Sequence, residues 1–101
     1  MKIYLFMFLL LPCTAQATFF DLGDASRGAK IFAHYDCNKC HREMVDGDGS
    51  AIFTRTNRIV TSSDKLIPRI KLCSGNIGAN LSAQEEQDLA AHLNQRYYHF
   101  K

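Results

Sequence analysis

One pentapeptide of the chain combines residue types and spacing that point to a specific chemistry, Cys37-Asn38-Lys39-Cys40-His41. A C-x-x-C-H sequence is the pattern that attaches a c-type haem, because each thiol can add to one vinyl group of the macrocycle. The adjacent histidine is then placed to coordinate the iron from one face. The pentapeptide therefore predicts one covalent haem c as cofactor, with Cys37 and Cys40 as attachment sites and His41 as the proximal iron ligand.

Other metal and redox chemistries fit the sequence less well. A thioredoxin-like cysteine pair would need strands and a longer chain, and the sequence has little strand signal. Zinc bound by the same three side chains would lack a well-spaced fourth ligand. The acidic stretch at residues 46–50 is not a calcium loop, because Ala51 replaces the required glycine and Asn57 the closing glutamate. It is expected to be a turn.

The first seventeen residues predict an export signal. Lys2 provides a positive start, residues 3–11 form a short apolar run, and Ala15-Gln16-Ala17 is an A-x-A cleavage site. The run is shorter than the about 20 apolar residues that a membrane-spanning helix needs. We therefore expect a signal peptide over residues 1–17 and a mature domain over residues 18–101 with no membrane span.

Two further points bear on this export signal. A lipoprotein signal cleaved before Cys13 is the alternative, but Pro12 stands where such signals usually carry a small residue. Attachment of c-type haem takes place on the periplasmic side in bacteria, so the signal and the pentapeptide support each other. The expected location is the bacterial periplasm.

Composition limits the mature chain to one small, nearly neutral domain. Its 84 residues carry eleven Lys and Arg against ten Asp and Glu once Lys2 is removed. A chain this short buries a modest core and often needs a cofactor or cross-link for stability, which a covalent haem would supply. No long basic run is present, so neither nucleic acid nor a membrane surface is expected as a partner.

Hydrophobic spacing predicts an all-α domain of three main helices. The first begins with an aspartate N-cap and leads into the pentapeptide. The second contains Pro68, which lies inside it or marks its true start. The third begins with the capping box Ser82-Ala-Gln-Glu85. The expected helices cover residues 24–35, 63–73 and 82–98, and a loop covers residues 42–62.

These features resemble the class I cytochromes c over most of the mature chain. The family has a G-x-x-[LIV]-F pattern before the haem motif, matched by Gly28-Ala-Lys-Ile31-Phe32, and an L-[ST]-x-x-E start to its last helix, matched by Leu81-Ser82-Ala-Gln-Glu85. The resemblance implies a small cytochrome c fold with the helices wrapped around the haem. It also implies a close crossing of the first and last helices at Gly28, Phe32, His92 and Leu93.

The sequence departs from the family at the two groups that complete the iron site. The family orients the proximal histidine with a proline carbonyl, but no proline occurs in the twenty residues after His41. Class I carriers also place a methionine before the last helix as the sixth ligand. Met44, the one methionine of residues 18–101, lies three residues after His41 and cannot reach the distal face. The corresponding stretch is Cys73-Ser74-Gly75-Asn76. Four alternatives remain for the distal site: open or water-filled, Asn76, Cys73 as thiolate, or a histidine such as His99.

The segment from Arg69 to Ser82 is similar to a high-spin branch of these proteins, typified by the sphaeroides haem protein. In that group an asparagine directly after the cysteine binds iron weakly, and a second cysteine closes a disulfide. These positions hold Ser74 and Leu81 here, so the disulfide is not expected and an accessible distal site is favoured. Cys73 is left unpaired, as a buried small side chain, an iron ligand or half of an intermolecular disulfide.

Two functions are compatible with this sequence. Small single-haem c-type proteins mostly carry one electron between transient redox partner proteins, and a non-enzymatic periplasmic carrier is the function that we expect. An open or weakly held distal site instead suits binding of a small gaseous ligand, oxygen or nitric oxide, by a sensor, scavenger or minor reductase. Four basic residues are expected as solvated surface, with partner docking or haem propionates as alternative uses: Arg55, Arg58, Arg69 and Lys71.

Overall fold

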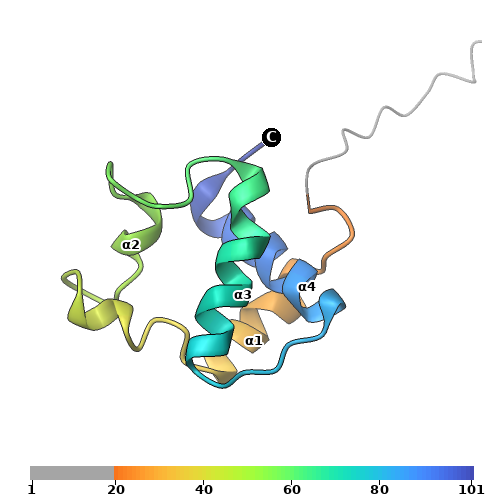
Figure 1. The fold of residues 1–101 in the computed structure, drawn as a ribbon. Helices are drawn as coiled ribbons and strands as arrows, with labels where there is room; N and C mark the ends of the chain where they lie inside the picture. Colours follow the sequence, from red (N-terminus) through yellow and green to blue (C-terminus); the bar gives the residue numbers. More distant parts are fainter. Residues whose placement is uncertain (1–19) are drawn as a thin grey trace, which may run out of the picture.

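A computed structural model of the protein describes residues 20–101, so the predicted signal peptide at residues 1–17 lies outside the described residues. All regular secondary structure in the described part is helical, in agreement with the expected all-α class (Figure 1). None of its helices is long and apolar enough to cross a membrane. The elements in chain order are α1 (Ala25–His34), η2 (His41–Glu43), α2 (Ala51–Thr54), η3 (Ser63–Lys65), α3 (Leu66–Asn76), α4 (Ala83–Leu93) and η4 (Asn94–Tyr98).

α1 and α4 form the centre of the fold and cross in close contact. Gly28 permits this crossing, because a Cβ atom there would lie 1.9 Å from the backbone oxygen of Asp88. Phe32, one turn further along α1, packs against the ring of His92 with 5.3 Å between centroids. Leu93 is buried in the same hydrophobic core. The helix crossing expected at these residues is therefore confirmed.

A buried carboxylate joins the start of α1 to α4. Asp24 caps α1 with its side chain, and its own N–H donates to Asp88 Oδ1 at 2.8 Å. Gln84 Nε2 and Arg27 Nε donate to the same carboxylate at 2.9 and 3.2 Å. Burial alone would raise the pKa of Asp88. The hydrogen bonds lower it by more, so the net pKa lies below the usual value. Asp88 is 2% exposed and stays ionised.

Replacement of Asp88 by Ala is expected to destabilise the protein by about 1–3 kcal/mol near neutral pH, because the partly buried Asp24 N–H loses its acceptor. The lowered pKa of Asp88 makes its contribution fully present above the usual carboxyl value of about 3.9, and lost as the pH falls through the folded pKa. Urea unfolding of wild type and variant near neutral pH and at about pH 3 measures this difference. Asp46→Ala, at an exposed loop position, is the control. An unchanged difference at low pH would contradict the assignment.

α3 differs from its predicted bounds at both ends. Residues 63–65 form the 3-10 turn η3, and the α-helix begins at Leu66. Pro68 lies in the first turn of α3, where a missing N–H removes no intrahelical hydrogen bond. The helix continues to Asn76 instead of ending at Cys73. The stretch from Cys73 to Asn76, which corresponds to the methionine position of the class I cytochromes c, is therefore the last turn of a helix.

The predicted third helix consists of two parts. Both hydrogen bonds of the capping box are present, from Glu85 N to Ser82 Oγ at 3.1 Å and from Ser82 N to Glu85 Oε1 at 2.8 Å. The α-helix ends at Leu93, and the π-helical turn η4 carries the chain on to Tyr98. His99 follows with a left-handed φ of 59° and ends the helical path.

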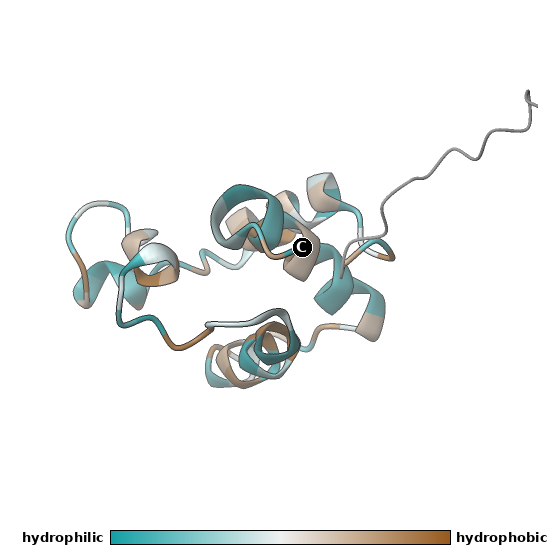
Figure 2. Ribbon diagram, turned by 90° about the horizontal axis from the view of Figure 1, so that it is seen from above, coloured by the Kyte–Doolittle hydropathy of each residue, from teal (hydrophilic) through white to brown (hydrophobic). Residues whose placement is uncertain are grey.

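α3 stands opposite the layer that contains α1 and α4. Figure 2 looks along α3 from above and shows this helix facing the other helices, with apolar segments on both sides. Leu66 and Ile70 of α3 pack into one core cluster with Leu89 and Leu93 of α4. α3 is thus held to the core near its N-terminal half, and its C-terminal half faces the Cys37–His41 segment across a cavity.

Candidate functional site

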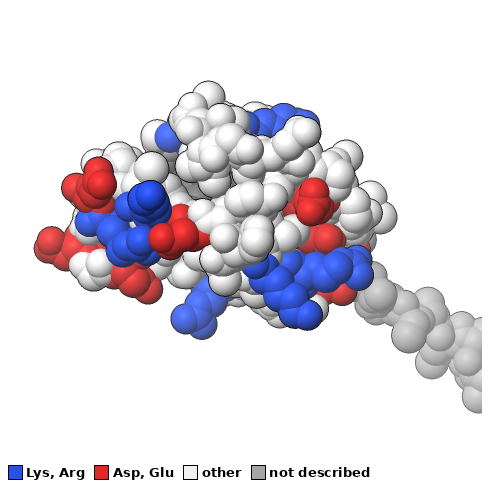
Figure 3. Space-filling model, turned by 90° about the horizontal axis from the view of Figure 1, so that it is seen from below, with Lys and Arg blue, Asp and Glu red and all other residues white. Residues whose placement is uncertain are grey.

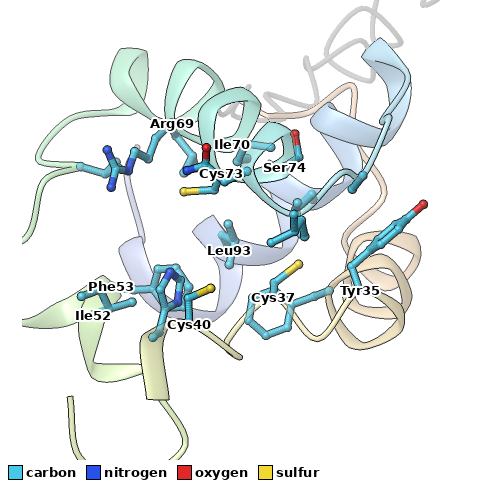
Figure 4. Close-up of a pocket in the computed structure, with 18 of the residues that line it drawn as sticks. Tyr35, Cys37, Cys40, Ile52, Phe53, Arg69, Ile70, Cys73, Ser74 and Leu93 are labelled. Carbon is cyan, nitrogen blue, oxygen red and sulfur yellow. The ribbon is translucent and has the colours of Figure 1, made fainter. Parts of the chain in front are cut away.

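A large apolar cavity opens between the Cys37–His41 segment and α3 (Figure 4). Its empty space is about 1110 Å³ when the open mouth is included. Most of the lining side chains are apolar, and they include Phe32, Ile52, Phe53, Leu66, Ile70 and Leu93. A mainly apolar ligand is the kind that this lining suits.

The three side chains predicted to hold haem all line this cavity. Figure 4 shows the sulfur atoms of Cys37 and Cys40 pointing into it from the wall opposite α3. Cys37 is half-buried, whereas Cys40 is exposed at the mouth. Burial raises the pKa of the Cys37 thiol to about 11, and Cys73 and Asp36 add to this rise. Within residues 20–101 no group of three or more His, Cys, Asp and Glu side chains could hold a bare metal ion.

The segment between α1 and η2 is held in a tight turn. Asp36 has a left-handed φ of 48°, and its carboxylate accepts two hydrogen bonds from Arg42 at 3.0 and 2.8 Å. The turn of residues 46–50 packs directly on this segment at Gly49, which has a φ of 91°. A Cβ atom at Gly49 would lie 3.0 Å from His41 Cβ. These contacts hold the turn that carries Cys37, Cys40 and His41 in one conformation.

His41 is oriented by contacts on two sides. Its Nδ1 lies 2.9 Å from the side-chain oxygen of Asn38, and its ring meets Phe53 edge-on with 5.2 Å between centroids. Burial lowers the pKa of His41, and the positive charges of Arg69 and Arg55 lower it further. The imidazole is therefore neutral near pH 7, which is the form that binds a metal ion. Asn38 and Phe53 are site residues that the sequence analysis did not identify.

The opposite wall carries the stretch proposed for the distal side. Cys73, Ser74 and Asn76 of α3 all line the cavity, and Figure 4 shows the Cys73 sulfur on this wall. The Ser74 hydroxyl donates back to the Lys71 carbonyl oxygen at 3.2 Å. Asn76 is exposed at the helix end. Cys73 and Ser74 are both half-buried, so they are more enclosed than Asn76.

The remaining histidines and Met44 do not complete the site. His34, His92 and His99 are not among the residues that line the cavity, so the described part of the chain brings only His41 to it. Met44 is 61% exposed, and its N–H donates to the His41 carbonyl oxygen at 2.9 Å. This bond keeps Met44 next to the proximal histidine, as the sequence predicts.

Two arginines supply positive charge at the cavity. Arg55 and Arg69 both line it. Arg55 Nε is buried and has no hydrogen-bond partner within the described residues. A buried guanidinium nitrogen without a partner is costly, and a carboxylate would satisfy it. The two propionates of haem are carboxylates, so these arginines, the two thiols and the imidazole together fit this group. Lys71 instead pairs with Glu86 at 2.8 Å.

No protein-family model, curated protein or solved structure matches this chain. The functional interpretation therefore depends on the pentapeptide and on the geometry of the cavity around it.

Proposed function

We propose that this chain is an exported c-type cytochrome that carries one electron at a time between partner proteins in the bacterial periplasm. One observation carries the proposal: the thiols of Cys37 and Cys40 and the ring of His41 line one wall of a large apolar cavity. The family resemblance points to the same fold and cofactor. The unsatisfied Arg55 side chain beside the cavity supports an anionic occupant.

Each residue of the site would have its own role in binding the haem. Cys37 and Cys40 would form the two thioether links, and His41 would bind the iron as neutral imidazole. The haem supplies one-electron chemistry, because its iron passes between the ferrous and ferric states. Arg55 and Arg69 would neutralise the propionates. The apolar lining excludes water, which limits the solvent rearrangement that accompanies a change of charge in the cavity.

The rim of the cavity suits brief contacts with partner proteins. Cys40 is exposed at the mouth, and four large apolar side chains that line the cavity are also partly exposed: Tyr35, Met44, Ile59 and Ile77. Acidic and basic side chains lie beside one another on the face shown in Figure 3. A small apolar rim favours transient docking over a permanent complex.

Binding of oxygen or nitric oxide is the second candidate function. The observation that favours it is the composition of the wall opposite His41, where Cys73, Ser74 and Asn76 line the cavity and neither methionine nor histidine does. A weak or absent sixth ligand would leave a coordination position for a small gas.

Optical and electron paramagnetic resonance spectra of the purified haem protein separate the two functions. For an electron carrier we expect low-spin iron in both oxidation states and spectra that carbon monoxide and nitric oxide leave unchanged. A stable six-coordinate iron changes little on reduction, which favours fast electron transfer. High-spin iron that binds either gas rapidly would instead support the second function.

The same spectra identify the distal ligand when two variants are included. Cys73→Ser removes the thiol and Asn76→Ala removes the amide, whereas Ser74→Ala serves as the matched control on the same helical turn. Loss of the low-spin signal in one variant identifies its residue as the ligand. A spectrum that a substitution leaves unchanged excludes that residue.

A further inference from the structure

Asn38, the first residue between the two cysteines, is the polar side chain in closest contact with His41. It is 7% exposed, which is unusual for an asparagine in a surface turn. Its backbone oxygen accepts from the Arg42 N–H at 2.9 Å, and its side-chain oxygen lies 2.9 Å from His41 Nδ1. Main chain and side chain of Asn38 are thus both engaged with the residues that follow Cys40.

This contact determines which nitrogen of His41 is free. An amide oxygen can only accept a hydrogen bond, so the Nδ1–H of His41 is the donor. The lone pair is then on Nε2, the nitrogen available to a metal ion. The edge-on contact with Phe53 helps to fix the ring plane, but offers no hydrogen bond.

The surrounding chain keeps this hydrogen bond enclosed. Gly49 is buried over the turn, and a Cβ atom there would lie 3.1 Å from the Asn38 backbone oxygen and 3.0 Å from His41 Cβ. The φ of 91° at Gly49 directs residues 46–50 onto the segment. A side chain at Gly49 would push the two segments apart, so the glycine allows the loop to cover the pair.

We propose that Asn38 is a positioning residue that orients His41 and sets its donor strength toward the haem iron. This inference rests on the proposed function, because it assigns Asn38 the orienting role for a bound haem. A hydrogen bond from Nδ1–H to a good acceptor increases the electron density of the imidazole. More electron density at the iron stabilises the ferric state, so Asn38 lowers the reduction potential. No proline occurs in the twenty residues after His41 to take this role.

The test compares the haem-loaded wild-type protein with Asn38→Asp and Asn38→Leu. Aspartate has nearly the same shape but is a stronger acceptor, and leucine has a similar volume but accepts no hydrogen bond. We expect the reduction potential to fall in the aspartate variant and to rise in the leucine variant. The chemical shift of the His41 Nδ1 proton, measured by NMR in the reduced protein, should move downfield with aspartate and upfield with leucine, because the hydrogen bond strengthens in one variant and is lost in the other. Asn57→Leu, at an exposed position outside the cavity lining, is the matched control and should change neither.

The outcomes distinguish the inference from the function on which it rests. A wild-type chain that carries no haem would refute both. A haem-loaded protein in which the His41 Nδ1 proton has the same chemical shift in the wild type and in both Asn38 variants would refute the role of Asn38 and leave the proposed function intact. If the leucine variant does not accumulate, the aspartate variant decides alone, because its shape preserves the packing. A shift in potential without a change in the chemical shift of the His41 Nδ1 proton reports charge only and also refutes the inference.

Discussion

Replacement of both Cys37 and Cys40 by alanine will leave the chain without covalently bound haem. The two thiols line the same cavity wall, and each would form one thioether link. Removal of both leaves no thiol on that wall, because the third cysteine of the described residues, Cys73, lies on α3 opposite them. The measurement is haem-dependent peroxidase staining of the exported protein after denaturing electrophoresis, which retains only covalently attached haem.

The controls for this experiment use the remaining cysteine and the single variants. Cys73→Ala should stain like wild type, since its position on the opposite wall is not used for attachment. Each single variant should keep one thioether, and the pyridine haemochrome band should shift because one vinyl group remains unreacted. Staining that persists in the double variant, or a wild-type protein that does not stain, would overturn the proposed function.

Gly28→Ala is expected to unfold the protein at markedly lower temperature. The added Cβ would lie 1.9 Å from the Asp88 backbone oxygen and 2.8 Å from His92 Cβ, so α1 and α4 would have to separate. Overpacking of this kind typically costs about 1–3 kcal/mol, and more where backbone must move. For a domain of this size, each kcal/mol corresponds to about 4–8 °C in Tm. Thermal unfolding followed by circular dichroism measures the change.

Gly75→Ala is the matched control for Gly28→Ala. Gly75 lies within α3, and a Cβ atom there would meet no other atom within 4 Å. Alanine should therefore stabilise α3 by about 0.5–1 kcal/mol, because it reduces the entropy of the unfolded chain. Opposite signs for the two substitutions are expected. Equal effects would show that the α1–α4 crossing does not depend on a bare backbone at Gly28.

The start of α4 could be predicted because its signal is short-range, whereas the α1–α4 crossing was expected only from the family resemblance. Gly28 and Phe32 belong to one helical pattern, and the Ser82 capping box is a four-residue signal whose two hydrogen bonds form within one turn. Cys37 and Cys40 are likewise recognised from adjacent positions. These sequence patterns involve only residues close together in the chain, whereas the crossing itself joins Gly28 and Phe32 to Asp88 and His92.

The features that sequence reasoning missed depend on chain geometry or on distant segments. The hydrogen bond of Asn38 depends on a turn that Asp36 enters with positive φ. Arg55 and Arg69 reach one cavity from separate segments and were expected on the solvated surface. Phe53 lies in α2, within a stretch that was expected to be a loop. No local sequence pattern indicates that these side chains lie at one cavity.

The end of α3 shows how one residue can shift a predicted boundary. Gly78 has a φ of 75° just after the C-cap Ile77, and the Ala79 N–H donates to the Ser74 carbonyl oxygen at 2.9 Å. This glycine-terminated arrangement is a common helix stop. The glycine signal is present in the sequence, but the predicted helix ends three residues too early, at Cys73.

The crossing of α1 and α4 also has a consequence for the assembly of the protein. Its closest contacts, between Gly28, Asp88 and the backbone of Asp24, involve none of the residues that line the cavity. Under the proposed function, the two terminal helices could therefore meet at these contacts while the mouth at Cys40 is still accessible. Formation of these contacts and attachment of the proposed haem would then be separable steps, although Phe32 and Leu93 belong to both the crossing and the cavity lining.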